Sequence, residues 1–129
     1  EIEGPHNTDM GLTIMKPGKV GREYHMTKGH FHESASADEY YFCLSGKGLI
    51  ILQSTEGELM HMMLNEGGGV YVPPGWAHRT VNVGDEDFIL LAIFPKDAGH
   101  DYGTSKEKGF GAIVVEVDGK PVVLDKQQY

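Results

Sequence analysis

The chain has 129 residues, of which 40% are hydrophobic and 23% are charged, and its formal net charge is −8. The length suits one domain with a single core, and an acidic chain without a basic stretch is not expected to bind nucleic acid. The longest apolar run, Phe88 to Phe94, is far shorter than the roughly 20 residues that cross a bilayer, and the single cysteine cannot form an internal disulfide, so we expect a cytoplasmic protein with no membrane partner.

Short apolar stretches separated by glycine and proline predict about ten β-strands. In chain order, we expect strands at residues 11–16, 39–45, 49–53, 58–64, 69–72, 79–83, 87–94, 112–117 and 121–124. Asp118-Gly119, between the last two stretches, predicts a tight hairpin. Only residues 101–108 are expected to form a turn or so of helix. Strands this short and closely spaced predict an all-β sandwich or barrel.

Two histidines, a glutamate and a third histidine stand at a spacing that suits a metal site. On a strand, the side chains of His30 and His32 point to the same face. Glu39 opens the next strand after a polar turn, so a hairpin can return its carboxylate to the pair, and His78 follows a Pro-Pro-Gly turn. Three imidazoles and one carboxylate form a recurring ligand set for open metal sites. We therefore predict that these four side chains bind one divalent ion inside the barrel.

Chance must be weighed against this interpretation. A His-x-His pair is expected roughly 0.4 times in a chain of this composition, whereas Pro-x-Gly-x-x-His is expected roughly 0.04 times. Each histidine alone is equally well explained as a core or surface residue, but the combination is specific. His6, His25 and His61 have no such context and are expected to be surface or packing residues.

The residues around the predicted ligands carry a family resemblance. HFHESASADEYYFCLSG resembles the first cupin motif, and GGGVYVPPGWAHRTVN matches the spacing of the second. The segments TKGHFH and AGHDYG resemble the cupin-type glucose-6-phosphate isomerases known from archaea and some bacteria, and the resemblance runs from about Gly11 to beyond Phe110. It implies that residues 1–129 form a single cupin domain, a double-stranded β-helix or jelly-roll-like barrel. It also implies that an N-terminal segment usual in the family is absent.

The same resemblance implies an aldose–ketose isomerase that interconverts glucose 6-phosphate and fructose 6-phosphate in glycolysis and gluconeogenesis. Glu39 is implied to move the proton between C1 and C2 as well as to bind the metal, although a hydride shift is a rival mechanism. Tyr41 and His100 are implied to contact the sugar and assist catalysis, and Tyr102 to contact the substrate. A divalent ion with open positions would stabilise the charge that develops on the two sugar oxygens. The family favours Fe²⁺, with Mn²⁺, Ni²⁺ or Zn²⁺ as alternatives.

The phosphate of the substrate is implied to contact Thr13, Thr27 and Gly29 through hydroxyl and backbone N–H groups. Phe94 stands where the family commonly has a tyrosine, which removes one hydroxyl. Two other functions use the same ligands: a metal-dependent cupin dioxygenase or decarboxylase, and a sugar-binding cupin without turnover. A homodimer is implied by the family and by base rate. Tyr40, Phe42 and Leu44, on the outer face of their strand, would suit a second layer or a partner surface.

Overall fold

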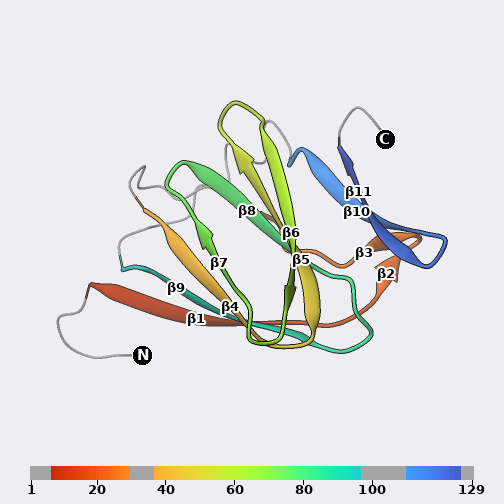
Figure 1. Ribbon diagram of the computed structural model, residues 1–129, viewed down its shortest axis with the longest axis horizontal. Coiled ribbons are helices and arrows are strands. Elements are labelled where there is room, and N and C mark those ends of the chain that lie inside the picture. The colour runs from red at the N-terminus through yellow and green to blue at the C-terminus, as the bar shows by residue number, and fades with distance from the viewer. Residues whose placement is uncertain (1–6, 30–36, 97–109, 126–129) are drawn as a thin grey trace.

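The computed structural model describes residues 7–29, 37–96 and 110–125, and every structural statement below concerns these residues. They form strands and connecting loops, with no helix in the described segments. The strands are β1 (Thr8–Met15), β2 (Lys19–Val20), β3 (Glu23–Tyr24), β4 (Glu39–Ser45), β5 (Lys47–Ser54), β6 (Leu59–Asn65), β7 (Gly69–Val72), β8 (Trp76–Asn82), β9 (Phe88–Pro95), β10 (Ala112–Val117) and β11 (Lys120–Asp125). Figure 1 shows them as three twisted sheets.

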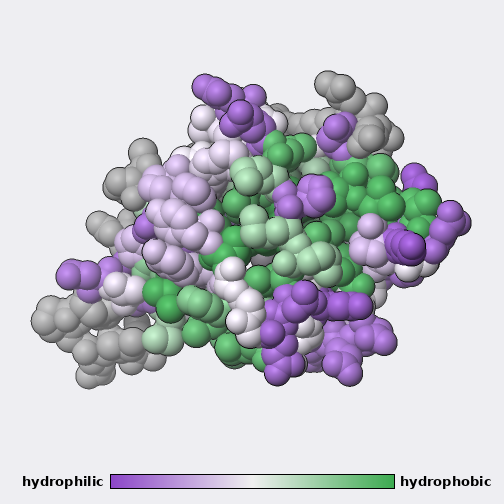
Figure 2. Space-filling model, viewed as in Figure 1, coloured by the Kyte–Doolittle hydropathy of each residue, from purple (hydrophilic) through white to green (hydrophobic). Residues whose placement is uncertain are grey.

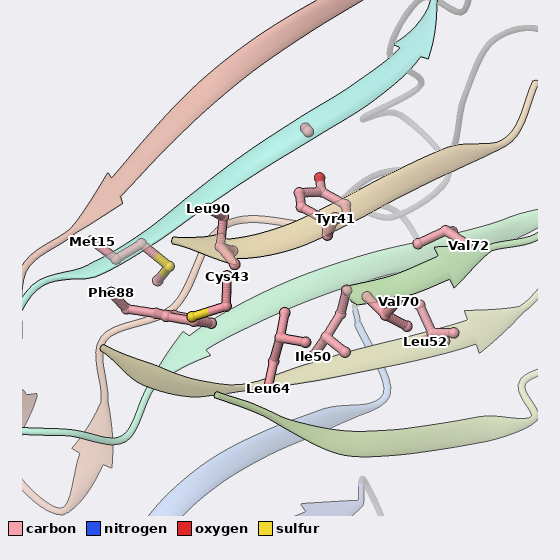
Figure 3. Packing of buried hydrophobic residues seen from close by; sticks show 11 residues of the cluster. Met15, Tyr41, Cys43, Ile50, Leu52, Leu64, Val70, Val72, Phe88 and Leu90 are labelled. Atoms are coloured by element: carbon pink, nitrogen blue, oxygen red, sulfur yellow. The ribbon is translucent and has the colours of Figure 1, made fainter. Parts of the chain in front are cut away.

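Two of the sheets enclose the main core. One has the strand order β1-β9-β4-β7 and the other the order β6-β5-β8, and neighbouring strands within each sheet are antiparallel. Alternation decides which side chains enter the space between them: along β4 the buried residues are Glu39, Tyr41 and Cys43, while the residues between them are exposed. Figure 3 shows the resulting cluster, with Tyr41, Ile50 and Leu90 pointing in from both sheets. The barrel interior is therefore an apolar core with a few polar residues set into it.

The third sheet, with the order β11-β10-β3-β2, covers the other face of β5 and β8. Its inward residues, among them Val114 and Tyr24, form a second apolar cluster with Ile51 and Val81. Because β5 is covered on both faces, the four residues from Leu49 to Leu52 are all buried. This two-sided burial explains why all four of these residues are apolar, rather than alternating with polar ones.

The observed strands confirm the predicted all-β class. Each stretch predicted as a strand is a strand, although β1 begins at Thr8 rather than at residue 11 and β8 begins at Trp76 rather than at residue 79. Residues Asp118 and Gly119 both have positive φ angles, 51° and 76°, as a tight hairpin turn between β10 and β11 requires. The two-residue strands β2 and β3 were not predicted, because two residues carry no measurable period. The predicted helical turn at 101–108 lies outside the described residues. No helix in the described segments is long and apolar enough to cross a membrane.

Candidate metal and substrate site

Glu39 and His78 meet inside the barrel from opposite sheets. Glu39 is the first residue of β4, and His78 lies on the inner face of β8; they are 3% and 2% exposed. The Nε2 atom of His78 lies 3.1 Å from Oε2 of Glu39. The turn before β8 fixes this approach, since Gly75 has a φ angle of +80° and the N–H of Trp76 donates to the carbonyl of Pro73 at 3.4 Å. The structure thus brings together two of the four predicted ligands.

The chemistry and spacing of this pair fit a divalent ion. Two ligand atoms that each lie about 2.1 Å from one ion are about 3 Å apart when they approach it at right angles. A buried carboxylate and a buried imidazole are also a donor combination common to several transition metals. No group of three or more histidine, cysteine, aspartate or glutamate side chains with metal-binding geometry occurs within the described part of the chain. The other predicted ligands, His30 and His32, lie outside it.

Aromatic and apolar side chains form the walls around the pair. Tyr41, on the same face of β4 as Glu39, places its ring edge-on to His78, with centroids 5.3 Å apart and an interplanar angle of 61°. Trp76 and Phe94 are half-buried and pack against the core beside it. Apolar walls lower the local dielectric constant and strengthen the electrostatic interactions of the charged groups within. His100 and Tyr102, also predicted to contact substrate, lie outside the described residues.

Cys43 is the next inward residue of β4, but its thiol is not a candidate nucleophile. Burial raises the pKa of the Cys43 thiol, which therefore stays protonated at neutral pH. The thiol lies 3.4 Å from the carbonyl oxygen of Ser45, to which it can donate. Cys43 therefore contributes packing to the core rather than chemistry.

The three residues predicted to bind phosphate lie on the β1 and β8 side of the barrel. Thr13 is half-buried on the inner face of β1, in register with Leu90 of β9. Thr27 follows β3, and its hydroxyl oxygen accepts the backbone N–H of Thr80 at 3.0 Å. Gly29 is buried, and a Cβ built on it would lie 3.3 Å from the backbone carbonyl oxygen of His78. The loop that carries Thr27 and Gly29 therefore runs alongside the strand that carries His78.

Arg79 fixes this loop and was not recognised in the sequence. Its guanidinium group donates to the carbonyl of Lys28 at 2.7 Å and to that of Ala112 at 3.2 Å, and it lies 4.5 Å from the centroid of the Phe110 ring. It thereby connects the loop to β8 and β10. The only sequence signal was its position next to His78. Lys28 itself is exposed. His25 and His61 are exposed as well, as predicted for surface residues, and His6 lies outside the described residues.

Replacing Gly29 with alanine is expected to destabilise the protein and to weaken substrate binding. Gly29 has a φ angle of +78°, and an added Cβ would lie 2.7 Å from the Phe110 ring. The strained backbone and the displaced ring together should cost about 1–3 kcal/mol. Thermal unfolding measures the first effect and KM for the substrate the second. Gly57→Ala is the matched control, because Gly57 also has a positive φ angle, +91°, but nothing within 4 Å of its added Cβ. Equal losses in both variants would contradict the role of the Phe110 contact.

Comparison with known proteins places these observations in a family. The family model described as glucose-6-phosphate isomerase (GPI) matches residues 3–129. A glucose-6-phosphate isomerase from Thermococcus litoralis is 54% identical over the 129 residues of this chain, which spans about two thirds (67%) of that relative's length.

Solved structures show a similar fold at lower identity. An oxalate oxidase in complex with the substrate analogue glycolate has a TM-score of 0.64 and 18% identity, and the match covers 75% of this chain and 46% of that one. The Bacillus subtilis oxalate decarboxylase, in a study of its Mn(II) centres, has a TM-score of 0.59 and 26% identity, with 70% and 22% covered. These likenesses agree with the predicted single-barrel cupin fold.

Proposed function

The chain belongs to the glucose-6-phosphate isomerase family and is an aldose–ketose isomerase, and we propose that it works through one divalent metal ion held between β4 and β8. The match to the family model and to the curated relative confirms the family resemblance found in the sequence. The observation that carries the metal proposal is the 3.1 Å approach of His78 to Glu39 in the barrel interior. His30 and His32 would complete the ligand set. The family favours Fe²⁺ at this site.

The reaction moves a hydrogen between C1 and C2 of the opened sugar, and Glu39 is the group proposed to move it. Its carboxylate sits among apolar walls from which water is largely excluded, so it can accept a proton from one carbon and return it to the next. The metal ion would supply Lewis-acid stabilisation to the two sugar oxygens. Tyr41 would orient the sugar from the same strand, His100 would assist the opening of the sugar ring, and Tyr102 would contact the substrate.

The phosphate end of the substrate would lie toward β1 and the Thr27–Gly29 loop. Thr13 and Thr27 offer hydroxyl groups, and Gly29 offers its backbone N–H, without any positively charged side chain among them. Neutral donors suit an anion that must also leave as product. Phe94 contributes apolar surface where the family commonly has a tyrosine. This arrangement would place the sugar carbons near Glu39 and the phosphate deeper along β1. We also propose that the reaction takes place in the cytoplasm and serves glycolysis and gluconeogenesis.

A coupled assay for conversion of fructose 6-phosphate to glucose 6-phosphate tests the proposed function. The expected result is turnover that depends on Glu39 and on a bound divalent ion. Oxygen uptake or CO₂ release with a small organic acid, and no isomerisation, would instead identify a dioxygenase or a decarboxylase. Binding of the sugar phosphate without turnover would identify a sugar-binding cupin. Similarity to the oxalate enzymes supports the fold alone, so the isomerase remains the favoured function.

We propose further that the chain forms a homodimer through the outer face of the β1-β9-β4-β7 sheet. None of the outward positions of these four strands carries a charged side chain. Seven large side chains on this face are each between 40% and 60% exposed: Met10, Leu12, Ile14, Tyr40, Phe42, Leu44 and Tyr71. If the full surface of each large side chain is taken as about 200 Å², the exposed fractions of the seven together amount to roughly 700 Å². This area is close to the ~800 Å² that each partner buries in a standard interface. Because each chain carries a net charge of −8, a second copy can best approach through an uncharged face.

Replacing Leu12 and Phe42 together with lysine is expected to convert the dimer to a monomer, because each new charge would have to be buried against the partner. Sedimentation velocity at micromolar concentration measures the mass, and circular dichroism checks the fold. The control is Met63→Lys with Val122→Lys, at two exposed apolar residues of β6 and β11 that lie outside this sheet. Figure 2 shows that apolar residues also gather over β6 and the β10–β11 hairpin. A monomeric unaltered chain would contradict the proposal, and so would dissociation by the control pair alone.

A further inference from the structure

Thr80 is a buried polar residue inside the barrel, on the same strand as His78. It is 3% exposed and lies on the inner face of β8 between His78 and Asn82. Asn82 has an evident structural role, since its side chain donates to the carbonyls of Met15 and Glu86 at 2.9 and 2.8 Å and closes the far end of the barrel. Thr80 makes no such closure. Its contacts lead instead to the loop that carries Thr27.

Three contacts join Thr80 to Thr27. The backbone N–H of Thr27 donates to the carbonyl of Thr80 at 2.9 Å, and the backbone N–H of Thr80 donates to the hydroxyl oxygen of Thr27 at 3.0 Å. The two hydroxyl oxygens are 3.3 Å apart. The Thr80 hydroxyl also lies 3.2 Å from the sulfur of Met15, on β1. Thr80 thus connects the loop, β8 and β1 at the side of the barrel where the phosphate is proposed to lie.

These contacts determine what the Thr27 hydroxyl can do. A threonine hydroxyl has one hydrogen to donate and two acceptor positions. In Thr27 the first acceptor position is occupied by the N–H of Thr80, and the hydroxyl of Thr80 can occupy the second. The hydrogen of Thr27 must then be donated away from β8. A hydroxyl held in this way is a dedicated donor, which matches a phosphate oxygen because that oxygen only accepts.

The sulfur of Met15 gives the Thr80 hydrogen an alternative position. A thioether is a weak acceptor, so the Thr80 hydroxyl can turn from Met15 to Thr27 at little cost. Thr27 can donate back to Thr80 when no ligand is bound, and donate to the ligand when an anion arrives. The pair of hydroxyls therefore changes direction without any movement of the backbone.

We propose that Thr80 is a positioning residue for the phosphate group of the substrate, acting through Thr27. The proposal rests on the proposed function, in which Thr27 contacts the phosphate, and extends it to a residue that does not touch the substrate. Thr80 holds the Thr27 hydroxyl in place through its own backbone. When an anion is bound, the side chain of Thr80 donates to that hydroxyl, so that Thr27 donates to the anion.

Thr80→Val tests the proposal, because valine keeps the shape and both backbone bonds and removes only the hydroxyl. KM for fructose 6-phosphate is expected to rise about threefold to tenfold, with kcat changed less than about twofold, since one oriented hydrogen bond is weakened. The inhibition constant of inorganic phosphate should rise by the same factor. Thr80→Ser restores the hydroxyl and should restore both constants. A merely structural role would lower the thermal midpoint without this selective change in phosphate binding.

A second variant keeps the test independent of the stability of Thr80→Val. Met15→Leu removes the competing acceptor with little change in volume, so phosphate inhibition should stay equal or become stronger. Weaker inhibition in Met15→Leu, or unchanged phosphate binding in Thr80→Val, would overturn the proposal. So would an unaltered chain that does not bind inorganic phosphate in a calorimetric titration. If phosphate binding changes as expected but no variant isomerises the sugar, the proposed function fails while the role of Thr80 stands.

Discussion

Replacing Glu39 with glutamine is expected to lower kcat for the isomerisation by about 10²- to 10⁴-fold, the range typical for loss of a positioned base. The substitution keeps the size of the side chain, which is 3% exposed and is closely surrounded. The amide can neither accept the proton from the sugar carbon nor supply a negative charge to the metal. KM should change less than kcat, because the phosphate contacts lie elsewhere in the barrel. Steady-state kinetics in the coupled assay measure both constants.

The neighbouring aspartate provides the control for Glu39→Gln. Asp38 precedes Glu39 in the chain, but its carboxylate accepts a hydrogen bond of 3.0 Å from the hydroxyl of Tyr71 at an exposed position. Asp38→Asn removes the same charge one residue away and should leave kcat within about twofold. Metal content must be measured in both variants, since Glu39 is also a proposed ligand. If Glu39→Gln kept its metal and more than about a tenth of the activity, Glu39 would not be the base.

Local patterns in the sequence were sufficient to predict the nine longer strands and the approach of two site residues. The alternation in EYYFCLS predicted that Glu39 and Tyr41 share the inner face of one strand, and burial along β4 agrees. The Pro-Pro-Gly turn predicted a fixed position for His78, which the structure places 3.1 Å from Glu39. Both predictions needed only the period of a strand and the geometry of a turn. The roles of these residues stay predictions, as do those of the residues outside the described segments.

Contacts between distant segments were not predictable in this way. Thr27 and Thr80 are 53 positions apart, and nothing in the period of either segment indicates that the loop after β3 lies along β8. The same is true of Arg79, whose partners Lys28 and Ala112 come from opposite ends of the chain. Such pairings depend on which strands face each other across the barrel. The polar residues that position a site can therefore be found only once the sheets are in place.

Removing the metal is expected to abolish isomerisation and to lower the thermal midpoint of the protein by several degrees. The proposed ligands Glu39 and His78 come from the two sheets that enclose the core, so a bound ion connects those sheets. A ligand present at 100 times its dissociation constant stabilises the folded state by about 2.7 kcal/mol. Without the ion, a buried carboxylate and a buried imidazole remain in an apolar interior at a cost.

Addition of Fe²⁺, Mn²⁺, Ni²⁺ or Zn²⁺ after chelation should restore the midpoint and the activity to different degrees. Affinity for nitrogen and oxygen ligands follows a fixed order among these ions, whereas the reaction needs open positions that both sugar oxygens can reach. The ion that stabilises most strongly therefore need not be the one that restores most activity. Glu39→Ala combined with His78→Ala is the control, and in it no added ion should raise the midpoint. Activity that persists in the chelator, or in this double variant, would show that the isomerisation proceeds without the proposed metal.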